Sequence, residues 1–166
     1  MKRSTPLLPT AIATEEGVYG IILVSGLVAA AGTAEMGSLH TLIFVGVTLI
    51  VFWVAHIYAG TVAVHGSGED EVVGLREAIQ HSVKRSRGLL VSGLIPAVPL
   101  LLGTFGIIGD KLAAWVALWL GTAVLALLGY AAYRRKNAPL HLRLIGAVST
   151  ASFGLVIIVV KAIVQH

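Results

Sequence analysis

The sequence has no cysteine and few charged residues. Of its 166 residues, 12% are Asp, Glu, Lys or Arg and 57% are hydrophobic, and its mean hydropathy is +0.91. Without cysteine, the chain cannot form disulfides, thiolate zinc sites or iron–sulfur clusters held by cysteine. Soluble domains carry about 25% charged residues. The composition therefore excludes both a soluble globular domain and a disordered chain.

Acidic residues and arginine are absent from five long apolar segments. Lys161 is the one Asp, Glu, Lys or Arg residue within these segments. Each segment is close to the roughly 20 residues that a helix needs to cross a bilayer. Lipid offers no hydrogen bonds to the backbone, so a spanning segment of this kind must be a helix, which forms these bonds internally. We therefore predict a single all-α, polytopic membrane domain over residues 1–166 with five transmembrane helices. The predicted spans cover about residues 17–34, 39–64, 88–108, 112–133 and 144–163.

Basic residues collect on one side of the predicted spans. Ten of the twelve lie there, and Lys111 and Lys161 fall on the other side. Because basic loops stay in the cytoplasm, this bias predicts a cytoplasmic N-terminus and an external C-terminus in the inner (plasma) membrane. The same bias accounts for the net charge of +4 without a nucleic-acid partner. The ten residues are Lys2, Arg3, Arg76, Lys84, Arg85, Arg87, Arg134, Arg135, Lys136 and Arg143.

One sizeable loop separates the second and third predicted spans. Val72, Leu75, Ile79 and Val83 recur at three- and four-residue spacing, and the basic residues follow toward Arg87. This pattern predicts a cytoplasmic amphipathic helix over about 71–87. Such a helix would lie on the anionic inner leaflet or cap the ends of the spans; a solvated connector helix is the alternative.

Small residues at four-residue spacing predict close helix packing. Gly146, Thr150 and Gly154 follow this spacing in the fifth span, and Gly26 and Ala30 follow it in the first. Such faces let membrane helices approach each other closely, either within one chain or between copies. We favour packing within the chain.

The candidate site consists of polar residues in the first two spans. Glu15 and Glu16 precede the first span, and Tyr19 follows one turn later. Trp53 and His56 lie in the half of the second span that faces the same side. His56 is about 12 Å from that end of its span, close to the depth of Tyr19. Because lipid burial of an ionisable group costs several kcal/mol, we expect His56 to point into the bundle and find a partner in the first span.

Three roles for His56 stay open. It can be a structural hydrogen-bond node between helices, part of an ion or proton pathway, or a metal or haem ligand. The ligand role requires a second ligand at matching depth, and spans three to five contain no histidine. We therefore predict no metal and no cofactor.

Glu15 and Glu16 also have a simpler interpretation. Acids in the first turn of a helix interact favourably with its dipole, and Thr14 is an ordinary N-cap. The chain contains no nucleophile elbow, phosphate loop or carboxylate pair inside a span. Since these motifs are absent, we predict that the protein is not an enzyme.

The start of the chain resembles a known family. The segment Thr14-Glu15-Glu16-Gly17-Val18-Tyr19-Gly20-Ile21 and the later Trp53-Val54-Ala55-His56 are similar to two signatures of the lysosomal potassium channels and their bacterial relatives. In that family a Phe-Ser-Asp-Gly-like signature opens the first helix, and a Trp-x-x-His-like element in the second bonds back to it. The resemblance covers about the first 65 residues. It implies a tetrameric pore lined by the first span, with Ile21 near the apolar constriction.

These observations predict a small inner-membrane channel or transport protein, with a cation as the candidate ion. The alternative is a non-catalytic accessory or scaffold subunit of a larger membrane complex. The expected partners are the lipid bilayer and either further copies of the chain or another membrane protein. The candidate pathway residues are Glu15, Glu16, Tyr19, Trp53 and His56, with Ile21 as the candidate constriction.

Overall fold

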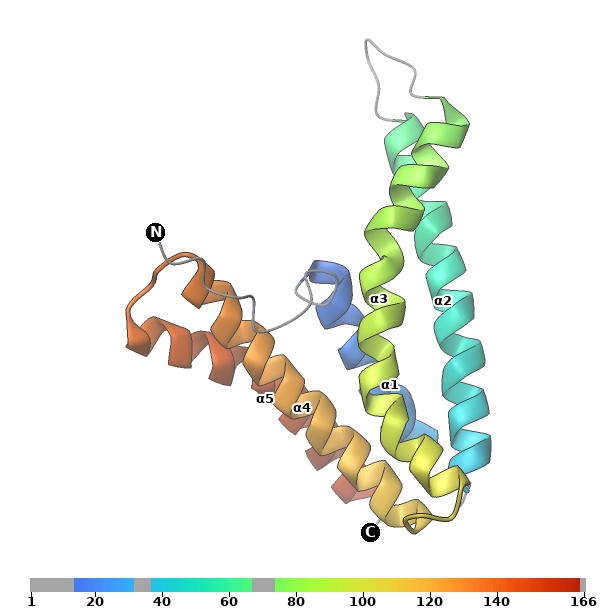
Figure 1. Cartoon of the computed structure of the whole chain (residues 1–166), viewed down its shortest axis with the longest axis vertical. Coiled ribbons are helices and arrows are strands. Elements are labelled where there is room, and N and C mark those ends of the chain that lie inside the picture. The colour runs from blue at the N-terminus through green and yellow to red at the C-terminus, as the bar shows by residue number, and fades with distance from the viewer. Residues whose placement is uncertain (1–13, 32–36, 67–73, 165–166) are drawn as a thin grey trace.

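The computed structural model describes residues 14–31, 37–66 and 74–164. Within these ranges the chain folds into five α-helices and no strand, which confirms the all-α class there (Figure 1). The basic residues Lys2 and Arg3, used above for the orientation, lie outside the described residues. The helices are α1 (Glu15–Ala31), α2 (Ser38–Gly66), α3 (Leu75–Thr104), α4 (Asp110–Arg135) and α5 (Leu140–Val164).

Four of these helices are long and apolar enough to cross a membrane. They are α2, α3, α4 and α5, with 25 to 30 residues each. The described part of the chain is therefore that of a membrane protein. Helix α1 has 17 residues, or about 25 Å, slightly less than the roughly 30 Å of a hydrocarbon core. Residues 32–34, the end of the predicted first span, lie outside the described residues.

The predicted amphipathic helix and the third predicted span form one helix, α3. It continues without a break through Gly88 and through Pro96 and Pro99. Its first turns pack against the other helices: Ala78, Ser82 and Ser86 are buried, and Ser82 contacts Gly60 of α2. The segment therefore stands beside α2 and does not lie flat as a separate helix. Residues 71–73 of the predicted helix are outside the described residues.

Helix α1 lies between two helical hairpins. Helices α2 and α3 form one hairpin, α4 and α5 form the other, and the two diverge toward the C-terminal ends of α2 and α4 (Figure 1). A Cβ at Gly93 of α3 would meet Val24 of α1 and Leu49 of α2, so three helices meet at this level. Successive helices run in opposite directions. The start of α1, the end of α2, the start of α3 and the α4–α5 loop therefore share one side.

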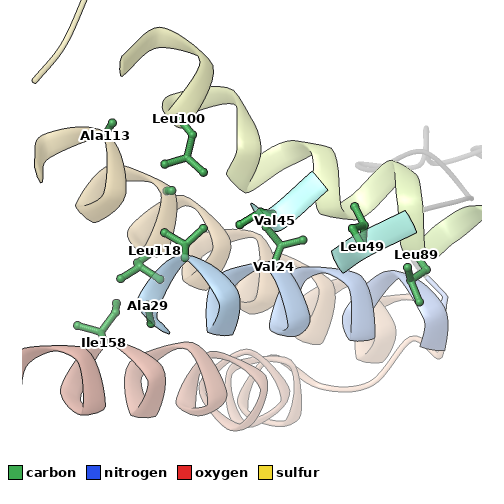
Figure 2. Packing of buried hydrophobic residues seen from close by; sticks show 11 residues of the cluster. Val24, Ala29, Val45, Leu49, Leu89, Leu100, Ala113, Leu118 and Ile158 are labelled. Atoms are coloured by element: carbon green, nitrogen blue, oxygen red, sulfur yellow. The ribbon is translucent and has the colours of Figure 1, made fainter. Parts of the chain in front are cut away.

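The core is built around α1. Val24 and Val28 of this helix are fully buried and contribute to a cluster that draws on all five described helices. Lipid tails are about as apolar as these side chains, so moving a side chain from lipid into the core stabilises the protein little. Close packing therefore holds such helices together. Figure 2 labels its members Val24, Ala29, Val45, Leu49, Leu89, Leu100, Ala113, Leu118 and Ile158.

Glycines allow the helices to approach to backbone contact. A Cβ on Gly20 would collide with the Leu89 carbonyl of α3, and one on Gly129 of α4 would collide with the Gly146 carbonyl of α5. Gly154 lies against Thr122 in the same way. The predicted close packing at Gly146 and Gly154 is thus confirmed within the chain. Gly26, in contrast, has open space where its Cβ would be.

We predict opposite effects for two alanine substitutions in α1. Gly20→Ala inserts a methyl group against α3 backbone and should cost about 1–3 kcal/mol of stability, the range for overpacking. Gly26→Ala meets nothing and should be neutral or stabilising by up to about 1 kcal/mol, because alanine favours the helix. Thermal unfolding in detergent measures both. Equal effects of the two substitutions would contradict the close approach of α1 to α3.

Candidate functional site

A charged cluster joins the start of α1 to α3. The Arg85 Nε atom donates a hydrogen bond to Oε1 of Glu16 at 2.6 Å, and its Nη2 lies 3.6 Å from Oε2 of Glu15. The Glu16 side chain is buried, whereas those of Arg85 and Glu15 are 61% and 73% exposed. The Thr14 hydroxyl caps the helix by accepting a hydrogen bond from the Gly17 amide. The cluster therefore fixes one end of α1.

The environment keeps Glu16 ionised. Burial alone would raise the pKa of the Glu16 carboxyl. The hydrogen bond from Arg85, the Glu16 backbone amide, the charge of Arg85 and Thr14 together outweigh burial and lower that pKa. Glu16 precedes the apolar part of α1, so the pair lies at the end of the helix bundle.

The structure shows no polar partner for His56 among the described residues. We expected a partner for His56 near Glu16 or Tyr19, but within the described residues His56 makes no hydrogen bond or ion pair. It is half-buried on α2, one turn from Gly60, and the Gly60–Ser82 contact places it level with Ser86 of α3. The Glu16 carboxylate is engaged by Arg85 instead.

The other candidates are dispersed. The Tyr19 ring is 57% exposed on the outside of α1. Trp53 is half-buried against the core cluster, and its indole nitrogen is buried without a hydrogen-bond partner among the described residues. Ile21 is fully buried and packs with Val124, Leu125 and Leu128 of α4.

A buried lysine lies at the opposite end of α1. The Lys161 side chain comes from α5 and is 2% exposed, and its Nζ donates to the Val28 carbonyl at 3.4 Å. The Val28 carbonyl is one of the last four of α1. Such carbonyls have no amide partner within the helix, and they attract cations. No carboxylate of the described residues lies within 4.0 Å of this ammonium group.

Neither Lys161 nor Arg85 was among the site residues predicted from the sequence. A signal for Lys161 existed, since it continues the face of Gly146, Thr150 and Gly154 at helical spacing. That face packs inward, and Lys161 is buried with it. No comparable signal existed for Arg85, because its pairing with Glu16 depends on the register between two helices that are distant in sequence.

Buried hydroxyl groups lie between the two ends of α1. Ser92 of α3 faces Gly20, and Ser25 of α1 faces Gly121 of α4. The Ser92 hydroxyl donates to the Leu89 carbonyl at 3.2 Å, and the Ser25 hydroxyl has no partner among the described residues. Polar groups thus occur at successive levels over the roughly 18 Å of α1 that separate Glu16 from Val28.

Within the described ranges, no three His, Asp or Glu side chains are close enough together to hold a metal ion. No family model, curated protein or solved structure matches the chain. The geometry alone therefore carries the functional argument.

We predict that Glu16→Gln destabilises the protein and flattens its acid sensitivity. Losing a charged hydrogen-bond partner costs about 1.5–3 kcal/mol, and the exposure of Arg85 places this case at the low end. Because the pKa of Glu16 is lowered in the folded state, its contribution is complete above the ordinary glutamate pKa. It is lost as the pH falls through the folded-state pKa. Unfolding measured against pH in detergent should show this loss in wild type only.

Glu15→Gln is the matched control for this experiment. Glu15 lies next to Glu16 and has the same chemistry, but it is exposed and 3.6 Å from Arg85. Its substitution should change stability by less than about 1 kcal/mol, as for other surface pairs. A larger loss with Glu15→Gln than with Glu16→Gln would reverse the roles assigned to the two carboxylates.

Proposed function

We propose that this chain is a small transport protein of the inner (plasma) membrane that conducts a cation, the proton included. In this proposal all five helices span the bilayer, with the N-terminus in the cytoplasm and the C-terminus outside. The burial of Lys161 carries the proposal. An ionisable group inside a membrane helix is costly, and such groups mark ion and proton pathways.

The position of Lys161 supports a functional role over a simple anchoring role. A lysine near the end of a span ordinarily extends its ammonium group to the interface. Lys161 instead directs it inward to α1, with one long hydrogen bond to a backbone carbonyl. The Glu16–Arg85 pair at the other end of α1, with Ser25 and Ser92 between, makes the surroundings of α1 the proposed route.

The resemblance to potassium channels suggests a different route, a pore between copies with Ile21 at its constriction. Ile21 is fully buried against α4. A pore of that kind would require α1 to leave its place between the hairpins. The burial of Ile21 therefore favours a route within one chain.

An accessory subunit of a membrane complex is the second candidate. Helix α2 supports it, because this helix is largely uncovered and exposes a broad apolar face that another membrane protein could cover. Among its exposed side chains are Ile43, Phe44, Val47, Ile50, Val51, Phe52 and Val54. An accessory subunit purified alone would conduct no ion.

We predict that Lys161→Met abolishes cation flux while the protein stays folded. Purified protein would be sized in mild detergent, reconstituted into liposomes and assayed with a proton-sensitive dye and with K⁺. Methionine has a similar length and removes the cost of burying a charge, so thermal stability should not fall. Reduced stability with unchanged flux would make Lys161 a structural cap of α1. Wild-type protein without flux would favour the accessory subunit.

The proposed orientation predicts the location of both the C-terminus and the α2–α3 loop. An alkaline phosphatase reporter fused after His166 should be active, because this enzyme matures only outside the cytoplasm. The same reporter inserted after Gly74 should be inactive, since that loop is on the basic side. Activity at Gly74, or inactivity after His166, would overturn the orientation or change the number of spans.

A further inference from the structure

Helix α3 is longer than its apolar part. Residues 88–104 contain no charged side chain and cover about 25 Å, most of a hydrocarbon core. The remaining residues, Leu75–Arg87, continue the same helix for a further 20 Å or so. Because α3 is one continuous helix, its polar part passes through the headgroup layer, which is about 5–8 Å thick on each side of the core.

One exposed face of α3 changes from basic to apolar at this boundary. Lys84, Arg87, Val91, Leu94 and Val98 follow each other at alternating three- and four-residue steps, so they share a face. All five side chains are exposed, and the last three are 40%, 61% and 50% exposed. The opposite face, with Ser82, Ser86 and Leu89, is buried.

The two cations on this face have no ion-pair partner among the described residues. Within the described ranges, the ion pairs of α3 belong to Arg85, which Glu15 and Glu16 neutralise. Lys84 and Arg87 have no carboxylate of the described residues within 4.0 Å. Arg87 lies at the edge of the apolar part, and Lys84 is about 4.5 Å further out. In a bilayer that α3 crosses, both charges would lie at the depth of lipid phosphates.

We propose that this face of α3 binds an anionic phospholipid. Lys84 and Arg87 hold its phosphate group, and Val91, Leu94 and Val98 receive an acyl chain. Charge complementarity and matched depth identify a lipid as the occupant, since a soluble anion would make no contact with the apolar side chains Val91, Leu94 and Val98. The proposal requires that α3 crosses the bilayer, and it does not depend on ion transport.

Arg76 provides a matched control. It lies on the same face of α3 and is exposed, but it is eleven residues before Arg87, or about 16 Å further out. This places Arg76 beyond the headgroup layer. Arg76→Gln and Arg87→Gln remove the same group from the same helix and differ in depth.

The test measures lipid retention by native mass spectrometry of the intact protein released from nanodiscs. The probes are phosphatidylglycerol and phosphatidylcholine in equal amounts. We expect wild type to retain phosphatidylglycerol preferentially. Lys84→Gln and Arg87→Gln should each reduce that preference about fivefold, and Arg76→Gln should leave it unchanged.

Three results would overturn the proposal. Equal retention of both lipids by wild type would show no headgroup preference. An equal loss with Arg76→Gln and Arg87→Gln would show a diffuse attraction without a site. Competition by millimolar inorganic phosphate would show a site for a soluble anion. Each readout is independent of flux, so a failure of the transport proposal would not affect it.

Discussion

The close approach of α1 to its neighbours is the constraint on which the arrangement depends. In lipid, apolar side chains are nearly as stable facing acyl chains as facing each other, so packing distance decides whether helices associate. Gly20 brings α1 against α3 backbone, and Gly121 brings α4 against Ser25 of α1. Both hairpins therefore hold the same helix. Without α1 they would share mainly the contact between α3 and α4.

Polar contacts then fix the position of α1 along its own axis, which packing alone does not determine. Packing of small residues permits some sliding, because successive turns of a helix offer similar surfaces. The Arg85–Glu16 hydrogen bond fixes the first turn of α1 to α3, and the Lys161–Val28 hydrogen bond connects its last turn to α5. The two bonds come from different hairpins, so they also fix the hairpins relative to each other.

The helical class, most of the helix ends and the inward glycine face of α5 could be predicted from the sequence because each depends on local composition or period, whereas the predicted face at Gly26 and Ala30 is not packed. The fusion of the amphipathic segment with the third span could not, since it depends on the burial of Ser82 and Ser86 and on the contact of Ser82 with Gly60 of α2. The partner of Glu16 was missed for a similar reason. The predicted depths placed Glu16 and His56 at one level, but they did not indicate that Arg85 would form the hydrogen bond with the Glu16 carboxylate.

The two charged contacts of α1 differ in their cost, and this difference bears on function. Glu16 and Arg85 neutralise each other at the bundle end, where the guanidinium group remains largely in contact with solvent or headgroups. The contribution of this pair to the stability of the fold is sufficient to explain it. Lys161 has no opposite charge among the described residues and lies inside the bundle, so its contact with Val28 carries the larger desolvation cost of a buried charge. Ionisable groups without an opposite charge inside membrane helices mark ion and proton pathways, which is why the proposed transport function rests on Lys161 and not on the Glu16–Arg85 pair.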